Sequence, residues 1–316
     1  MKRPKPKAAA DDASIVGEIR GRGPGVLFFH GWNHSKEIWR PVVDELEDER
    51  TAVTVDLPGY GDSPPLSTEN MTLSYYSALT SSAIEEVKQV LAARGTFLRT
   101  VVGDSLGAIF LLEILKGPDN TSREGGVSVN LSFKTNGAPS FSRSGKQAKR
   151  LEFEGEENLV LSGCPSEGLP PYIASVKRIQ AIRVGLSALH SIPEWMSRRL
   201  IRVLSLGTVR RYRHVNDDLV DSVMKADPET SQYLFQEIAD YTFGRPGNGK
   251  SQDDYTVHVV RGERDRITSK SKSQLLARKL KGTYEEIPAV GHTPMIENPT
   301  EYASITRKHS ADSRKL

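Results

Sequence analysis

The chain of 316 residues contains a single cysteine, Cys164, so its fold cannot depend on an intrachain disulfide. A lone thiol is typical of proteins from reducing compartments, and it excludes the small disulfide-rich classes. No apolar run approaches the ~18 residues needed to span a bilayer, and no signal-peptide apolar stretch follows the basic start Met1–Ala10. We therefore expect a cytoplasmic protein without stable membrane insertion.

The sequence also lacks an excess of charge of either sign. Its 43 basic and 40 acidic residues leave a net charge of +3, so nothing in the balance indicates a nucleic-acid partner. Hydrophobic residues make up 37% of the chain, which at this length is enough for one large core or two smaller ones. We attribute this modest share to a disordered basic tail over 1–13, a polar insertion over about 118–157, and a second tail over 309–316.

One strand-to-helix junction carries a candidate nucleophile. The β-branched stretch Thr100–Val102 leads into Gly103-Asp-Ser-Leu-Gly107, and an apolar stretch rich in helix formers, Ala108–Leu115, follows. The pattern predicts a strand and a helix joined by a sharp turn that exposes Ser105. Flanking glycines permit the close backbone approach that such a turn requires. The N-terminus of the following helix favours negative charge developing at this point.

Four sequence blocks, in this order and spacing, resemble the α/β-hydrolase superfamily. They are His30–Asn33 after the apolar strand Val26–Phe29, the Gly- and Pro-rich turn Asp56–Ser63, the Gly103–Gly107 junction, and the Gly-His block Ala289–Pro299. The resemblance implies an α/β fold with a mostly parallel central sheet flanked by helices and an inserted helical cap. It is closest to the lid-bearing, carboxylesterase-like serine hydrolases.

The resemblance also implies a catalytic triad. Ser105 matches the nucleophile, Asp265 matches the acid in the turn after a late strand, and His292 matches the general base. This order along the chain is the order of the fold. Glu167, after the preceding strand, and Glu263 are the alternative positions for the acid.

By the same match, the main-chain N–H groups of Trp32 and Leu106 form the oxyanion hole, which stabilises the charge of a tetrahedral intermediate. His30 belongs to the oxyanion loop, and Asp56 and Asp62 have structural roles. Structural roles are also expected for five further histidines, His34, His190, His214, His258 and His309.

The resemblance divides the chain into a core, over 14–165 and 246–308, and a helical cap over 166–245. Four cap helices are expected, over Ile173–Leu189, Pro193–Leu206, Asp217–Met224 and Ser231–Phe243. Trp195, Met196 and Leu200 are candidates for the substrate pocket. The polar insertion is longer than the family's connection, and we expect a mobile surface excursion with at most a marginal hairpin at Val127–Phe133. A regulatory or partner-docking loop is the alternative.

The implied reaction is hydrolysis of a small-molecule carboxylic ester or lactone through an acyl-serine, with no metal or organic cofactor. Ser105 disfavours the epoxide hydrolases and haloalkane dehalogenases of this fold, which have aspartate as the nucleophile. Carbon–carbon bond hydrolysis, thioester hydrolysis and cofactor-free perhydrolysis use the same triad and stay open. A ligand receptor on a hydrolase scaffold is the alternative of another class. The natural substrate and the oligomeric state are left undetermined.

Overall fold

The computed structural model describes residues 13–116, 127–135, 141–144, 157–170, 173, 181–204, 216–244 and 255–310. In this part of the chain nine strands form one sheet in the order β6-β5-β1-β3-β2-β4-β7-β8-β9. They are β1 (Ala13–Gly21), β2 (Gly25–Phe29), β3 (Thr51–Val55), β4 (Leu98–Asp104), β5 (Val129–Thr135), β6 (Phe141–Ser144), β7 (Glu157–Ser162), β8 (Tyr255–Gly262) and β9 (Thr283–Ile287). Only the pairs β1–β3 and β5–β6 are antiparallel. The predicted mostly parallel sheet is therefore confirmed.

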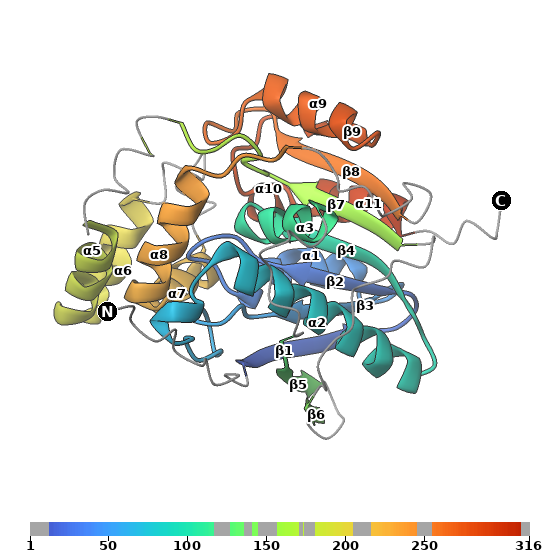
Figure 1. Cartoon of the computed structure of the whole chain (residues 1–316), viewed down its shortest axis with the longest axis horizontal. Helices are drawn as coiled ribbons and strands as arrows, with labels where there is room; N and C mark the ends of the chain where they lie inside the picture. Colours follow the sequence, from blue (N-terminus) through green and yellow to red (C-terminus); the bar gives the residue numbers. More distant parts are fainter. Residues whose placement is uncertain are drawn as a thin grey trace, which may run out of the picture.

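Helices cover both faces of the sheet (Figure 1). One face packs against α2 (Leu73–Ala93), α3 (Leu106–Lys116) and α9 (Lys270–Lys279), the other against α1 (Arg40–Leu46), α10 (Pro294–Glu297) and α11 (Pro299–His309). Strand β2 shows the consequence, because Leu27 and Phe29 join one core and Val26 and Phe28 join the other. A strand that is covered on both faces has a continuously apolar sequence. The apolar stretch Val26–Phe29 therefore agrees with the position of β2 in the sheet.

The helical stretch after Ser35 is divided in two. Ser35 caps a 3₁₀ turn, η1 (Lys36–Trp39), and α1 then begins at Arg40. Pro41 explains the break, because proline lacks an N–H and is favoured in the first turn of a new helix. A second short 3₁₀ turn, η2 (Thr68–Asn70), precedes α2.

Four further helices, which we call the α5–α8 group, gather beside one end of the sheet, on the left in Figure 1. They are α5 (Ala181–Ser191), α6 (Glu194–Leu204), α7 (Asp217–Met224) and α8 (Pro228–Ala239). All four helices were predicted, but α8 begins three residues earlier than expected. Asp227 explains the start, because its side chain accepts a hydrogen bond from the Thr230 N–H at 2.7 Å.

Part of the polar insertion is built into the sheet. Strand β5 runs parallel to β1 and pairs with it from Ala13–Val129 to Ile19–Thr135, and β6 pairs antiparallel with β5. Phe133 is 1% exposed and packs over Gly17, where an added Cβ would lie 2.7 Å from its ring. The expectation of a surface excursion with at most a marginal hairpin is therefore wrong for this part. Residues 117–126, 136–140 and 145–156 lie outside the described residues.

The ends of the chain differ slightly from expectation. Residues 1–12 and 311–316, where tails were predicted, lie outside the described residues. His309 does not begin a tail, because it ends α11 and its ring stacks on His258 with centroids 3.4 Å apart. Among the described helices, none has both the length and the apolar composition to cross a membrane.

The burial of Phe133 predicts a large effect of Phe133→Ala. Removing the ring leaves a cavity between β5 and β1, so the free energy of unfolding should fall by about 3 kcal/mol or more. Urea denaturation measures this loss. Phe97→Ala is the matched control, because Phe97 is 46% exposed and its removal should cost less than about 1 kcal/mol. Equal losses in the two variants would contradict the placement of β5 in the core.

Candidate active site

The backbone at Ser105 takes the sharp turn that its motif predicts. Ser105 lies between β4 and α3 with φ +48°, in the left-handed region, and its N–H donates to the Ser162 carbonyl at 2.8 Å. An added Cβ at Gly107 would lie 2.6 Å from the Phe29 carbonyl oxygen, and one at Gly103 would meet the first turn of α3 at 2.7 Å. A side chain at either position would clash with neighbouring backbone atoms, so the turn requires glycine at both positions.

The structure brings Ser105, His292 and Asp265 together from three loops. His292 Nε2 lies 3.2 Å from Ser105 Oγ, and His292 Nδ1 lies 2.9 Å from Asp265 Oδ2. Asp265 follows β8, and His292 lies between β9 and α10. The carboxylate accepts from Nδ1–H, which leaves the Nε2 lone pair facing the serine hydroxyl. This is the arrangement in which an imidazole can remove a proton from a serine.

Asp265 is held in place by its own turn. Its Oδ1 accepts from the N–H groups of Ile267 and Thr268 at 2.7 and 3.1 Å, and its Oδ2 also accepts from the Thr268 hydroxyl. Arg261 donates to the Asp265 carbonyl at 2.8 Å. Burial alone would raise the pKa of Asp265, but His292 and the Thr268 donors outweigh burial and lower it. The carboxylate is therefore charged at neutral pH.

His292 is buried beside this carboxylate. Burial lowers its pKa, but Asp265 opposes burial so strongly that the net pKa lies above the ordinary histidine value. The ring also packs against Gly163, which has φ +51°, and an added Cβ there would lie 3.1 Å from His292 Cε1. Sequence reasoning missed Gly163, which directly follows β7.

The two alternative positions for the triad acid, Glu263 and Glu167, have partners other than His292. Glu263 Oε2 accepts from the Ala289 N–H at 2.6 Å, and so braces the loop that carries the histidine. Glu167 Oε1 lies 3.5 Å from Lys279 Nζ. Neither carboxylate contacts His292 in the described structure, whereas Asp265 does.

The loop over residues 30–34, which the resemblance predicts to be the oxyanion loop, is anchored on both sides. Leu106 begins α3, so its N–H belongs to the first turn, which has no acceptor within the helix. His30 accepts from the Leu57 N–H through Nε2 at 2.9 Å and donates to the Gly31 carbonyl through Nδ1. Burial lowers the pKa of His30 to about 4, so the ring is neutral. An added Cβ at Gly31 would lie 3.2 Å from Ser105 Cβ, which shows how closely the loop passes the nucleophile.

Trp32 connects this loop to the α5–α8 group. Its indole Nε1–H donates to the Ser231 carbonyl in α8 at 2.9 Å, and its ring packs against Phe235 with centroids 5.1 Å apart. The sequence predicted a role for the main chain of Trp32, but not this role for its side chain. The N–H of Trp32 is thereby fixed relative to both the nucleophile and α8.

Asp56 and Asp62 act as structural anchors. The ammonium of Lys36 lies 2.7 Å from Asp56 Oδ2 and 2.8 Å from Asp62 Oδ2. Lys225, just after α7, lies 3.0 Å from Asp62 Oδ1. Burial would lower the pKa of Lys36, but the two carboxylates outweigh it and raise the pKa. This network joins the α5–α8 group to the turn that begins η1.

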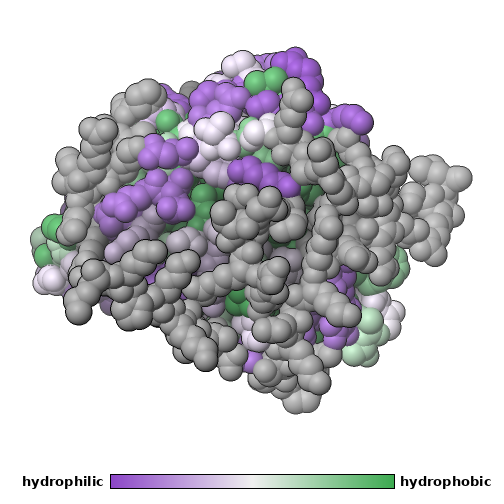
Figure 2. Space-filling view, in the orientation of Figure 1, coloured by the Kyte–Doolittle hydropathy of each residue, from purple (hydrophilic) through white to green (hydrophobic). Residues whose placement is uncertain are grey.

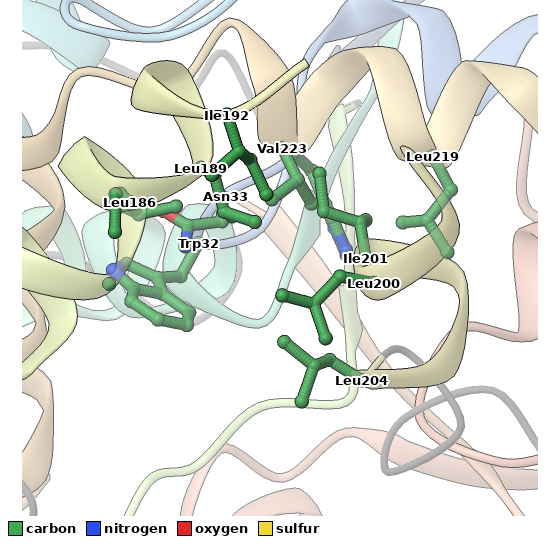
Figure 3. Close-up of a pocket in the computed structure, with 13 residues that line it drawn as sticks. Trp32, Asn33, Leu186, Leu189, Ile192, Leu200, Ile201, Leu204, Leu219 and Val223 are labelled. Carbon is green, nitrogen blue, oxygen red and sulfur yellow. The ribbon is translucent and has the colours of Figure 1, made fainter. Parts of the chain in front are cut away.

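A cavity of about 550 Å³ lies between the oxyanion loop and the α5–α8 group (Figure 3). It is lined by Trp32, Asn33, His34, Gly185, Leu186, Ala188, Leu189, Ile192, Leu200, Ile201, Leu204, Leu219 and Val223. None of these residues is an aspartate, glutamate, lysine or arginine. Burial lowers the pKa of His34 to about 3, so the cavity is uncharged at neutral pH.

The three predicted pocket residues have different positions. Leu200 lines the cavity, whereas Trp195 and Met196 are not among its lining residues and are 66% and 41% exposed. Hydrophobic surface is visible in Figure 2 at the left-hand edge, where α5 and α6 lie in Figure 1. The apolar spacing along α6 thus did not distinguish residues that face the cavity from residues that face solvent.

Of the remaining histidines that the structure describes, His190, His258 and His309 have partners away from the nucleophile, whereas His34 lies near it. His190 bonds to the Met224 carbonyl at 2.8 Å, His258 stacks on His309, and His214 lies outside the described residues. Within the described ranges, no group of three or more His, Cys, Asp or Glu side chains is placed to hold a metal ion.

The family profile described as "Alpha/beta hydrolase family" matches residues 26–305. The chain belongs to the α/β hydrolase family. The match includes the nucleophile turn, the Asp265 turn and the His292 loop, so the predicted fold class is confirmed.

Among curated relatives, the chain is similar to the pimeloyl-[acyl-carrier protein] methyl ester esterase of Vibrio vulnificus. The two are 32% identical over 92 residues, which is 29% of this chain and 31% of the relative. Among solved structures, an esterase from Thermogutta terrifontis has a TM-score of 0.62 at 17% identity, with 94% of each chain covered. The enol-lactonase from Burkholderia xenovorans has a TM-score of 0.59 at 15% identity, covering 96% of this chain and 98% of that one.

The contact between Gly163 and the imidazole predicts a loss of serine reactivity in Gly163→Ala. An alanine is strained at this φ, and its Cβ would displace His292 from Ser105. The rate of reaction with a fluorophosphonate, followed by intact mass, should fall at least tenfold.

Gly95→Ala is the matched control. Gly95 also has a positive φ, +74°, but an added Cβ there would meet nothing within 4 Å. Both variants should lose about 1 kcal/mol of stability from backbone strain, and only Gly163→Ala should lose reactivity. Equal reactivity of the two would show that Gly163 does not position the histidine.

Proposed function

We propose that this α/β hydrolase is a serine hydrolase that cleaves a carboxylic ester or lactone. The observation that carries the proposal is the hydrogen-bonded line from Ser105 through His292 to Asp265, at a turn that exposes the serine. His292 takes the proton of Ser105 as Oγ bonds to the carbonyl carbon. Asp265 orients the imidazole and stabilises the imidazolium that results.

The oxyanion of the tetrahedral intermediate accepts hydrogen bonds from the main-chain N–H groups of Trp32 and Leu106. In a comparable hydrolase the loss of one such donor costs about 2.7–4 kcal/mol. His292 then gives its proton to the departing alcohol oxygen as the carbon–oxygen bond breaks. A water molecule, deprotonated by the same imidazole, attacks the acyl-serine, and release of the acid restores the Ser105 hydroxyl.

The proposed cap is the α5–α8 group, and the proposed substrate carries an uncharged, apolar group that enters the 550 Å³ cavity. Two observations support this assignment. The lining of the cavity is apolar, and each buried CH₂ contributes about 0.8 kcal/mol. Trp32, Asn33 and His34, three consecutive residues of the oxyanion loop, form one wall of the cavity, which therefore adjoins the reacting carbonyl.

The nucleophile is tested by hydrolysis of p-nitrophenyl butyrate. Ser105→Ala removes the attacking oxygen and should lower kcat by at least ~10⁴-fold, because the triad acts as a unit. Ser162→Ala is the control, since its side chain has no part in the reaction although its carbonyl accepts from Ser105. Turnover retained in Ser105→Ala would overturn the proposed mechanism.

The cavity is tested by substituting a residue in its wall. Leu186 in α5 lines the cavity and is 6% exposed, so Leu186→Trp should fill part of it. The ratio of kcat/KM for p-nitrophenyl octanoate to that for the acetate should fall at least tenfold. Val184→Trp places the same side chain on the same helix at a 62% exposed position and should leave the ratio unchanged. A ratio unaffected by Leu186→Trp would place the apolar group elsewhere.

A further inference from the structure

The proposed mechanism uses the main-chain N–H of Trp32 and gives its side chain no part beyond the cavity wall (Figure 3). The indole nevertheless has a specific partner, because its Nε1–H donates to the Ser231 carbonyl in α8 at 2.9 Å. Its ring packs against Phe235, one helical turn further along α8, with centroids 5.1 Å apart. Trp32 and Ser231 lie 199 positions apart in the sequence, so this contact is not part of the local turn geometry.

The acceptor on α8 is itself fixed to the core. Asp227, which caps α8, donates its N–H to the Gly59 carbonyl at 2.8 Å. Gly59 has φ +81°, and an added Cβ there would overlap the side chain of Thr230. The first turn of α8 therefore packs directly on the turn Asp56–Ser63. Ser231 follows in the same turn of the helix and is 0% exposed, so its carbonyl is a firmly held acceptor.

The peptide group that joins Gly31 to Trp32 carries the proposed oxyanion donor. Its carbonyl, on Gly31, accepts from His30 Nδ1–H at 2.8 Å and from the His34 N–H at 3.2 Å. A peptide group is planar and trans, so the Trp32 N–H points the opposite way from this carbonyl. Within the described residues this N–H has no hydrogen-bond acceptor. It is therefore available to the oxygen of a bound ester.

The residue after the donor has a strained backbone. Asn33 has φ +55°, in the left-handed region, which costs most non-glycine residues about 1–2 kcal/mol. Such a conformation persists where the surrounding structure holds it. The bonds from His30 and His34 restrain the carbonyl of the peptide group. The bond from the indole of Trp32 to Ser231 restrains the same turn from the side of α8.

We propose that the side chain of Trp32 is a positioning residue for the oxyanion hole. Its bond to Ser231 and its packing on Phe235 hold the main-chain N–H of the same residue where the oxyanion develops. The inference rests on the proposed function. A cavity wall binds the ester and the transition state alike, whereas a correctly placed donor stabilises the oxyanion more than the neutral carbonyl. Loss of this anchor should therefore lower kcat more than it raises KM.

The test compares two competitive inhibitors of p-nitrophenyl butyrate hydrolysis. The carbonyl carbon of 1,1,1-trifluoro-2-octanone accepts Ser105 Oγ while His292 takes the proton, which leaves an oxyanion in the hole. Its analogue 2-octanol has a chain of the same length but no carbonyl, so it reports on the apolar wall alone.

Trp32→Phe keeps an aromatic ring and removes the indole N–H. Its inhibition constant for the ketone should rise at least about tenfold, because an oxyanion donor is displaced, while that for 2-octanol should stay within about twofold of the wild type. Trp39→Phe is the matched control. Trp39 is 0% exposed, but its Nε1 has no hydrogen-bond partner in the described structure, so both constants should stay within about twofold.

Equal rises for both inhibitors in Trp32→Phe would assign the ring to the wall alone and overturn the inference, as would an unchanged constant for the ketone. If Trp32→Phe does not fold, Phe235→Leu decides, because it loosens the packing from α8 and leaves Trp32 intact. The same selective loss, of at least about threefold, is expected there, and its absence would contradict the inference. A wild-type enzyme that the ketone does not inhibit would instead contradict the proposed function.

Discussion

The left-handed backbone of Ser105 is the constraint on which the rest of the site depends. A non-glycine residue in this conformation costs about 1–2 kcal/mol, and the surrounding packing must hold it there. The bond from its N–H to the Ser162 carbonyl joins it to β7, and Gly107 lets the oxyanion loop approach within contact distance. As a result, the serine hydroxyl meets the imidazole of His292, and the N–H of Leu106 begins a helix beside it.

The α5–α8 group is attached to the segment from Trp32 to Lys36 through two connections of different chemistry. Trp32 donates to the Ser231 carbonyl from within the oxyanion loop, and Lys225 reaches the Asp62–Lys36 pair near the start of η1. The same loop forms one wall of the apolar cavity and carries the N–H of Trp32, which is the proposed oxyanion donor. A shift of these helices would therefore change the cavity and the proposed oxyanion hole together.

The sequence predicted the parallel sheet, the nucleophile turn and the positions of Asp265 and His292, because local patterns decide them. It did not predict that β5 joins the sheet, although Val129, Leu131 and Phe133 alternate with polar residues, because a partner distant in sequence determines the burial of such a strand. The sequence also did not predict which residues form the wall of the cavity. Whether Leu186 or Trp195 faces the substrate depends on how helices pack together, and both fit an amphipathic pattern.

The most direct measurement of the central claim is intact-mass analysis of the protein after reaction with a fluorophosphonate, followed by peptide mapping. We predict a single adduct on Ser105, formed faster as pH rises through the pKa of His292, and absent in Ser105→Ala. Folded wild-type protein that forms no adduct, or an adduct on another residue, would contradict the account, because the triad geometry would then fail to activate this serine.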